Sequence, residues 1–315
     1  MAKYVRIASL PAGALTVENV HDYEACTQAE IARWKQQLDL VACDKPDLIL
    51  TPECCDRPAM LPAAERSPYY RVRGDRVRDF FCGEAKRLHA NIAYSAAREM
   101  PDGTFRNSIQ MISREGKVID AYNKYLLVIE ENTQNGILYG KDCHAMQTDI
   151  GRVCGSICFD LNFDEPLALT KAQHPDITLF ASNYHGGMMQ QYWAYQTRSF
   201  FVSCIGTTST ASIINPVGTT VAESNNYYKY LSATINLDCK VAHLDHNMDK
   251  FAAMKRKYGA LIDMDTPYGL GCTLLTCNAA DMTIDDVIAE FGIELWDDYY
   301  ARSMAARYIP GRIED

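Results

Sequence analysis

Residues 47–53 read Asp-Leu-Ile-Leu-Thr-Pro-Glu. The apolar run in this stretch is too short for a helix and lies between Pro46 and Pro52, which predicts a buried β-strand. Glu53 would then follow the carboxyl end of the strand, where ligand crevices form in α/β sheets. Partial burial there would raise the pKa of the Glu53 carboxyl toward the range useful for a general base. A turn or helix-capping carboxylate is the alternative explanation for this residue.

Two more reactive side chains follow predicted strands. Residues 155–160 read Gly-Ser-Ile-Cys-Phe-Asp, in which small residues precede Cys158 and a polar turn follows it. This pattern is typical of a nucleophile at a sharp bend after a strand, and such a thiol needs a neighbouring base or cation to form a thiolate. Lys124 ends the segment 118–124. Taken singly, an inert buried thiol and a surface lysine are the simpler explanations.

Outward from these stretches, strand and helix patterns alternate along the chain. Because consecutive strands and helices alternate and several strands form hairpin pairs, we expect sheets packed on each other and covered by helices. The predicted strands are 4–10, 47–51, 91–98, 107–113, 118–122, 152–158, 177–181, 202–205, 211–214, 217–222 and 232–237. The predicted helices are 26–42, 73–89, 165–172, 188–201 and 247–258, with an acidic helical segment over 283–304.

Composition excludes several classes of protein. The chain has 315 residues, with 31 Lys and Arg against 40 Asp and Glu, for a net charge of −9. This balance argues against nucleic acid or an anionic membrane surface as the main partner. The sequence has no apolar run of 18 residues, and its first ten residues lack the apolar core of a signal peptide. We therefore expect a cytoplasmic protein, with no membrane partner and with its twelve cysteines reduced.

Metal-binding patterns are weak. Cys154 and Cys158 are separated by three residues, but they lie at the end of a predicted strand and not on a zinc knuckle. His243 and His246 could offer two ligands, but a solvated cluster at the start of a helix is the better interpretation. We expect no metal ion and no other cofactor.

Together, three ordered blocks resemble the carbon–nitrogen hydrolase (nitrilase) superfamily, which uses a Glu-Lys-Cys triad. Residues 48–53 are similar to its apolar strand followed by Pro-Glu. Residues 122–127, Tyr-Asn-Lys-Tyr-Leu-Leu, resemble its Tyr-Arg-Lys-x-His-Leu block, with Asn123 and Leu126 at the Arg and His positions. Residues 155–165 resemble its Gly-x-x-Ile-Cys-Tyr-Asp-x-x-Phe-Pro-Glu block, with Asp164 at the proline position.

This resemblance implies an α/β fold, a four-layer αββα sandwich with two central mixed sheets. The hydrolase domain would span residues 1–262, and residues 263–315 would form a C-terminal extension. The implied catalytic residues are Glu53, Lys124 and Cys158. The implied supporting residues are Glu131, with Glu130 as its alternative, and Phe159, whose backbone N–H would face an oxyanion. The implied substrate-binding residues are Asn183, Tyr184 and His185.

The resemblance also implies the reaction, the cleavage of a non-peptide C–N bond in a small amide or carbamoyl compound through a Cys thioester. A nitrilase acting on a small nitrile is one alternative, and a catalytically silent binding member of the family is another. The expected partners are a small-molecule amide or nitrile and further copies of the chain, as a homodimer or higher oligomer. The acidic segment 283–298 could reach across such an interface or pack on its own subunit.

Overall fold

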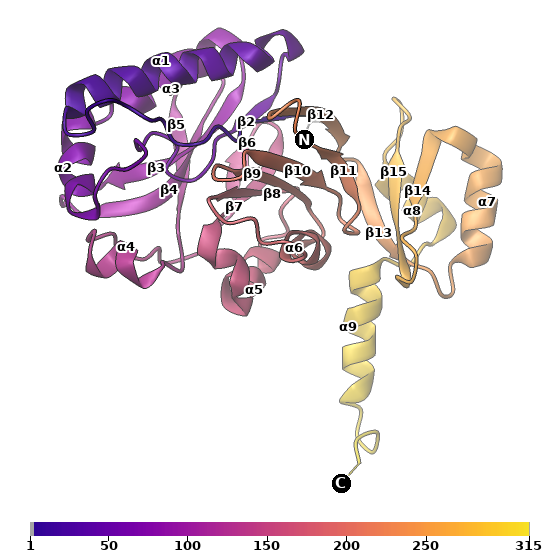
Figure 1. Cartoon of the computed structure of the whole chain (residues 1–315). Coiled ribbons are helices and arrows are strands. Elements are labelled where there is room, and N and C mark those ends of the chain that lie inside the picture. Colours follow the sequence, from indigo (N-terminus) through magenta and orange to yellow (C-terminus); the bar gives the residue numbers. More distant parts are fainter. Residues whose placement is uncertain (1–2, 315) are drawn as a thin grey trace. The chain divides into compact units, whose positions relative to one another are not determined.

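The computed structural model describes residues 3–314. The chain divides into two compact units, Met1–Ile235 and Asn236–Asp315 (Figure 1). The sequence predicted a division at residue 262. The observed division comes earlier because β13 (Cys239–His243) and β14 (Ile262–Asp265) both pair with β15 (Cys272–Cys277), which keeps residues 239–277 in one sheet.

The first unit contains a six-stranded sheet in the order β12-β1-β2-β3-β4-β5. Strands β1, β2 and β3 run parallel, whereas β3, β4 and β5 are antiparallel neighbours, so the sheet is mixed. All three residues of β2 are buried, as its uninterrupted apolar sequence requires. The strands are β1 (Tyr4–Ser9), β2 (Leu48–Leu50), β3 (Asn91–Glu99), β4 (Phe105–Ile112), β5 (Val118–Asn123) and β12 (Leu231–Asn236).

A second six-stranded sheet in this unit has the order β11-β10-β9-β8-β7-β6. Its central strands β7, β8 and β9 are parallel, and its outer strands are antiparallel to their neighbours. The strands are β6 (Met146–Thr148), β7 (Gly151–Ile157), β8 (Ile177–Ser182), β9 (Phe200–Ile205), β10 (Thr210–Ile214) and β11 (Thr220–Glu223).

The two sheets face each other, with helices on their outer sides (Figure 1). Strand β1 contacts β9, and the Ser9 hydroxyl donates to the Ser203 carbonyl across 2.9 Å. Helices α1 (Tyr23–Val41), α2 (Ala63–Arg73) and α3 (Arg76–Leu88) cover the first sheet, while α5 (Asp164–Ala172) and α6 (Met189–Thr197) cover the second. This arrangement confirms the predicted four-layer αββα sandwich.

Apolar side chains fill the two helix–sheet interfaces. Trp34 and Val77 pack with strand residues such as Ile92 under the first sheet's helices, and Trp193 packs with Phe180 under the second sheet's helices. Burial of these large side chains from water is the main force that holds the layers together.

The second unit has its own antiparallel sheet, β13-β15-β14, and its own buried cluster, which includes Phe251, Met254 and Leu275. Its helices are α7 (Met248–Tyr258), α8 (Ile284–Phe291) and α9 (Trp296–Arg307). The helical segment predicted over 283–304 is thus two helices. Thr283 caps α8 by accepting from the Asp286 N–H, and Gly292 ends it in the left-handed conformation.

The structure differs from the predicted elements in two places. Helix α2 was not among the predicted helices, and Pro68 lies inside it. The helix expected over 188–201 ends at Thr197, because Arg198 takes a positive φ of 55° and Phe200 and Phe201 belong to the buried strand β9. Each helix described between residues 3 and 314 is too short or too polar to cross a membrane.

Candidate active site

Glu53 lies just beyond the carboxyl end of β2, as the sequence predicted. Strand β2 is held between β1 and β3, so the position where Glu53 leaves the sheet is fixed on both sides. Two residues later the Cys55 N–H donates to the Ser95 carbonyl across 2.9 Å. Glu53 itself is only 7% exposed, so its carboxylate needs partners inside the protein.

A buried ionic network fixes the loop that follows Glu53. The Arg73 guanidinium donates to Asp56 Oδ2 at 2.5 Å and to the Ala97 carbonyl at 2.7 Å. The hydroxyl of Tyr94 also donates to Asp56 Oδ2, and the hydroxyl of Tyr69 donates to the Asp56 carbonyl at 2.7 Å. Sequence reasoning missed this network because its members come from three elements that only the fold brings together.

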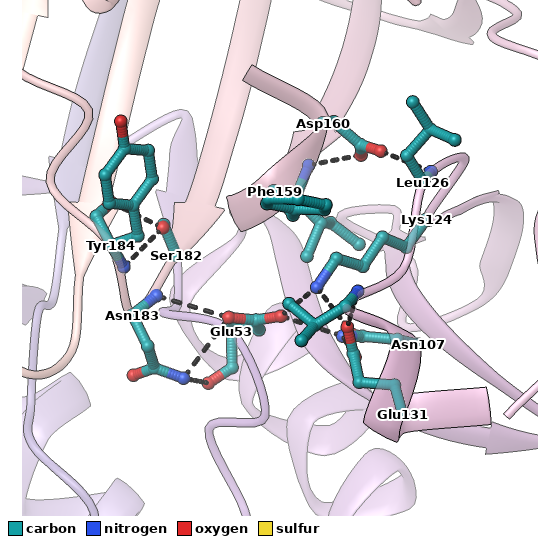
Figure 2. Close-up of polar contacts among 12 residues, drawn as sticks. Glu53, Asn107, Lys124, Leu126, Glu131, Phe159, Asp160, Ser182, Asn183 and Tyr184 are labelled. Carbon is teal, nitrogen blue, oxygen red and sulfur yellow. Dashed lines mark hydrogen bonds and ion pairs between the residues drawn. The ribbon is translucent and has the colours of Figure 1, made fainter. Parts of the chain in front are cut away.

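Lys124 follows β5, and its side chain extends to the Glu53 carboxylate (Figure 2). Its Nζ lies 2.9 Å from Glu53 Oε1 and 2.6 Å from Glu131 Oε2, and its side chain is 1% exposed. The backbone is held on both sides, by the Lys124 N–H to the Asn107 carbonyl and by the Gly140 N–H to the Lys124 carbonyl, each at 2.8 Å. Gly140 has no room for a Cβ, which would lie 2.2 Å from the Asn123 carbonyl oxygen.

Asn107 on β4 links the two carboxylates, and the sequence analysis did not single it out. Its Nδ2 donates to Glu53 Oε1 at 2.8 Å and to Glu131 Oε1 at 2.9 Å (Figure 2). The sequence signal that could have identified Asn107 is an amide side chain within a strand whose other residues are mostly buried. Of the two adjacent glutamates, Glu131 is the one that reaches Lys124, whereas Glu130 is exposed.

Cys158 stands at the end of β7, where the chain turns into a 3-10 helix over Cys158–Asn162. Its φ of 48° lies in the left-handed region, which costs energy for a residue with a side chain. Asp160 holds this turn. It is fully buried and accepts from the Ile157 N–H at 2.9 Å, from the Leu126 N–H at 2.7 Å and from the Tyr122 hydroxyl at 2.7 Å.

Asp160 therefore ties the cysteine turn directly to the lysine segment. Figure 2 shows its carboxylate between the two backbone donors. Because the Leu126 contact uses the backbone, it does not depend on a histidine at that position. Burial raises the pKa of Asp160 to about 6 against the opposing effect of its backbone donors, so the carboxyl is ionised at neutral pH.

The electrostatics of the cluster favour an ion pair beside a neutral thiol. Burial acts to raise the pKa of Glu53, but the Lys124 ammonium and the Asn107 amide outweigh it, so the pKa is lowered. The sequence had predicted a raised pKa for Glu53, which is wrong because Lys124 lies within hydrogen-bond distance. Burial acts to lower the pKa of Lys124, yet Glu53 and Glu131 raise it overall. Burial and the charge of Glu53 raise the pKa of the Cys158 thiol to about 12, although Lys124 opposes this.

The predicted substrate-wall segment follows β8. Asn183 contacts Glu53 through its backbone N–H, 3.2 Å from Oε2, and through its side-chain amide, 3.3 Å from the same oxygen. Tyr184 is 40% exposed, and its hydroxyl donates to Asn162 Oδ1 at 3.1 Å. His185 is exposed, and its ring accepts from the Gly187 N–H within its own loop. The structure thus brings Asn183 to the cluster, and it places His185 in contacts of its own loop.

A cavity of about 270 Å³ opens beside Glu53. The segments after β1, β2, β8 and β9 all reach it. Its lining includes Ala12, Ala14, Glu53, Arg57, Asn183 and Thr207. A space of this size, lined by the Glu53 carboxylate, the Arg57 guanidinium and the Asn183 amide, is suited to a small polar molecule.

The sequence pattern of one protein family matches residues 15–240, and that family is the carbon–nitrogen hydrolases. This chain belongs to the carbon–nitrogen hydrolase family. The match covers the three blocks that carry Glu53, Lys124 and Cys158. The family assignment by resemblance is therefore confirmed, and the chain is by family a hydrolase of C–N bonds.

Solved structures similar to this hydrolase share its fold at low sequence identity. Nit3 of Saccharomyces cerevisiae, a member of branch 10 of the nitrilase superfamily, has 15% identity and a TM-score of 0.63 over 75% of this chain and 91% of its own. A carbon–nitrogen hydrolase of Helicobacter pylori G27 has 13% identity and a TM-score of 0.60 over 75% and 90%. The amidase of Nesterenkonia sp. has 15% identity and a TM-score of 0.60 over 82% and 98%. A comparison with curated proteins found no match.

Proposed function

We propose that this hydrolase cleaves a non-peptide C–N bond of a small amide or carbamoyl compound through a thioester on Cys158, releasing ammonia or an amine. One observation carries the proposal: a buried carboxylate, Glu53, and a buried ammonium, Lys124, form an ion pair, and both act electrostatically on the Cys158 thiol. A base, a cation and a nucleophile around one point are what acyl transfer through a covalent intermediate requires.

In the first half of the proposed reaction, Glu53 takes the thiol proton as the sulfur of Cys158 attacks the carbonyl carbon of the substrate. A C–S bond forms, and the carbonyl electrons move to oxygen. Lys124 and the backbone N–H of Phe159 would stabilise this oxyanion. Collapse of the intermediate breaks the C–N bond, and the proton held by Glu53 passes to the leaving nitrogen.

In the second half, Glu53 removes a proton from a water molecule, whose oxygen attacks the thioester carbon. The C–S bond breaks, the sulfur of Cys158 regains a proton from Glu53, and the acid leaves. Because the pKa of the thiol is raised to about 12, the sulfur is a poor thiolate in the resting site, and proton transfer to Glu53 has to accompany attack. The lowered pKa of Glu53 keeps its carboxylate ionised and ready to accept the proton at neutral pH.

The role of Lys124 depends on its two carboxylate partners. Glu53 and Glu131 together keep it charged, so it presents a fixed positive charge in a water-poor site. Asn107 holds both carboxylates in place by donating to each. We propose Glu131 and Asn107 as positioning residues, which act on the substrate through Lys124 and Glu53.

A solved structure of a similar fold supports a cysteine adduct. A mutant of the amidase of Nesterenkonia sp. AN1 has been solved with the acetamide moiety of fluoroacetamide covalently added at its active-site cysteine. That chain shares 15% identity with this one and has a TM-score of 0.58. That adduct shows a nucleophilic cysteine in the similar fold, and the resemblance of the blocks around Cys158 extends a nucleophilic cysteine to this chain as a proposal.

The proposal is tested by ammonia release from a panel of small amides and their matching nitriles. We expect ammonia and the acid from amides, and a loss of at least about 1,000-fold in kcat/KM for Cys158→Ala and for Glu53→Gln, because each removes a reacting group. Consumption of nitriles but not amides would favour the nitrilase alternative. Absence of turnover and of any protein adduct across the panel would overturn the proposal in favour of a silent binding member.

A further inference from the structure

Two arginines close to the Glu53–Lys124–Glu131 network have no carboxylate partner. Arg57 lines the cavity next to Glu53, and it also lines a smaller cavity on its other side, which Arg66 and Glu131 share. Both arginines are half-buried. Among residues 3–314, no Asp or Glu lies within ion-pair distance of either guanidinium, and Arg66 Nε is buried without a hydrogen-bond partner. A half-buried guanidinium normally pairs with an anion.

Other arginines in the same part of the fold follow that rule. Arg33 pairs with Glu30 at 2.7 Å, and Arg73 pairs with Asp56 at 2.5 Å. Arg57 belongs to the loop that these two ion pairs hold in place, yet it makes no ion pair with a described carboxylate. Arg57 and Arg66 therefore present binding capacity that the protein does not satisfy internally.

The other charges of the site are already engaged. Lys124 pairs with Glu53 and Glu131, and the ionised Asp160 also acts on it. Arg57 and Arg66 stand outside that network of charges. In a low-dielectric pocket such a guanidinium attracts an anion more strongly than it would in water.

Arg57 is held in a defined position. It lies four residues after Glu53 on the loop that Asp56 anchors, and its N–H donates to the Cys54 carbonyl at 3.1 Å. It lines the smaller cavity together with the buried Tyr70. The base and the cation therefore stand in a fixed relation to each other, which allows one small molecule to contact both.

From this geometry we infer that the substrate is a small amide that also carries a carboxylate, bound by Arg57 in the cavity beside Glu53, with Arg66 adding positive charge behind it. This inference rests on the proposed amide hydrolysis, and it narrows the substrate class. The guanidinium fork fits a planar carboxylate with two parallel hydrogen bonds. The scissile amide would then lie at the Glu53 end of the cavity, and the cavity's size of about 270 Å³ limits the substrate to a small acid.

The kinetic test uses matched pairs that differ only in charge: malonamate and malonamide, succinamate and succinamide, glutaramate and glutaramide. We expect wild-type kcat/KM to favour the monoamide carboxylate of at least one pair by about 10- to 100-fold, the size of a lost charge-assisted contact. Arg57→Met should bring that ratio close to one, and Arg57→Lys should restore only part of it. Arg71→Met, on an exposed arginine of the same region, is the control and should keep the ratio.

Two kinetic results would overturn the inference: a wild-type ratio near one for all three pairs, or a ratio that Arg57→Met leaves unchanged. A binding test separates this failure from failure of the proposed hydrolysis. Succinamate and succinamide are titrated calorimetrically into Cys158→Ala and into Cys158→Ala/Arg57→Met. Binding of succinamate that needs Arg57 supports the inference even if no amide is turned over, whereas equal binding of both compounds, or no binding that depends on Arg57, contradicts it.

Discussion

Glu131 is the nearer of the two carboxylates that hold the Lys124 ammonium. Its Oε2 lies 2.6 Å from Lys124 Nζ, against 2.9 Å for Glu53 Oε1. The same Glu131 oxygen accepts from the Val128 N–H at 3.0 Å, so the start of α4 (Ile129–Thr133) fixes the carboxylate. Lys124 is thus oriented by Glu131 as well as by Glu53.

We therefore expect Glu131→Gln to lower kcat/KM for the preferred amide by about 10- to 100-fold, because one charge-assisted hydrogen bond to Lys124 is lost. Glu130→Gln is the matched control, since that side chain is exposed and one position away. It should change kcat/KM by less than about twofold. Equal effects of the two substitutions would show that Glu131 has no special role.

The raised pKa of Cys158 predicts a thiol that reacts slowly in the resting enzyme. Burial and the charge of Glu53 raise this pKa to about 12, so the neutral thiol dominates below that pH. N-ethylmaleimide at pH 7 should modify the exposed Cys43 well before Cys158, and the rate at Cys158 should rise about tenfold per pH unit up to pH 9. Peptide mass mapping over time measures both rates. Rapid, pH-independent labelling of Cys158 near pH 7 would instead indicate a preformed thiolate.

Gly155 leaves the space that Tyr122 occupies beneath the cysteine turn. A Cβ at Gly155 would lie 2.7 Å from ring atoms of Tyr122, whose hydroxyl donates to Asp160. We expect Gly155→Ala to destabilise the protein by about 1–3 kcal/mol, a drop of roughly 2–10 °C in Tm, and to reduce activity. Gly83→Ala on α3 is the control, because nothing lies within 4 Å of its Cβ position and alanine favours a helix. Differential scanning calorimetry compares them, and an unchanged Tm for Gly155→Ala would contradict the packing argument.

Glu30 gives the fold a pH dependence near neutrality. It is fully buried, and burial raises its pKa to about 7 despite the neighbouring Arg33. The folded protein therefore holds the Glu30 proton more tightly than the unfolded chain, whose pKa is near 4.5. The stability that this group contributes is fully present below pH 4.5 and is lost as the pH rises through 7. From pH 4 to pH 8 we expect wild type to lose up to about 3 kcal/mol of unfolding free energy relative to Glu30→Gln. Urea unfolding of both proteins tests this, and a difference independent of pH would contradict it.

The sequence predicted the sandwich well because its strands carry strong local signals. Residues 48–50 are an unbroken apolar run between prolines, and β7 combines an apolar run with small residues before Cys158. Such runs indicate buried strands, and their alternation with helices indicates packed sheets covered by helices, whereas the four-layer order was implied by the family resemblance. The resemblance of the three blocks then predicted, from the amino-acid sequence alone, that Glu53, Lys124 and Cys158 share one site.

The remaining features depend on contacts between distant residues. Asn107 and Asp160 carry no local signal beyond being polar in buried segments, so only the fold shows which charges and donors they meet. His243 was predicted to be solvated, yet it is buried and stacks on Trp296 and Tyr299, with ring centroids 4.9 and 3.8 Å apart. Its partners lie more than fifty residues later, beyond the reach of any local pattern.

The central claim is that Cys158 forms a covalent acyl intermediate, and intact-protein mass after acid quench tests it most directly. Wild type and Cys54→Ala, which removes the thiol next to Glu53, are mixed with the amide panel and quenched within the first turnovers. We predict the added mass of one acyl group on both proteins and none on Cys158→Ala. An acyl adduct that persists in Cys158→Ala, or full turnover by that variant, would contradict the account.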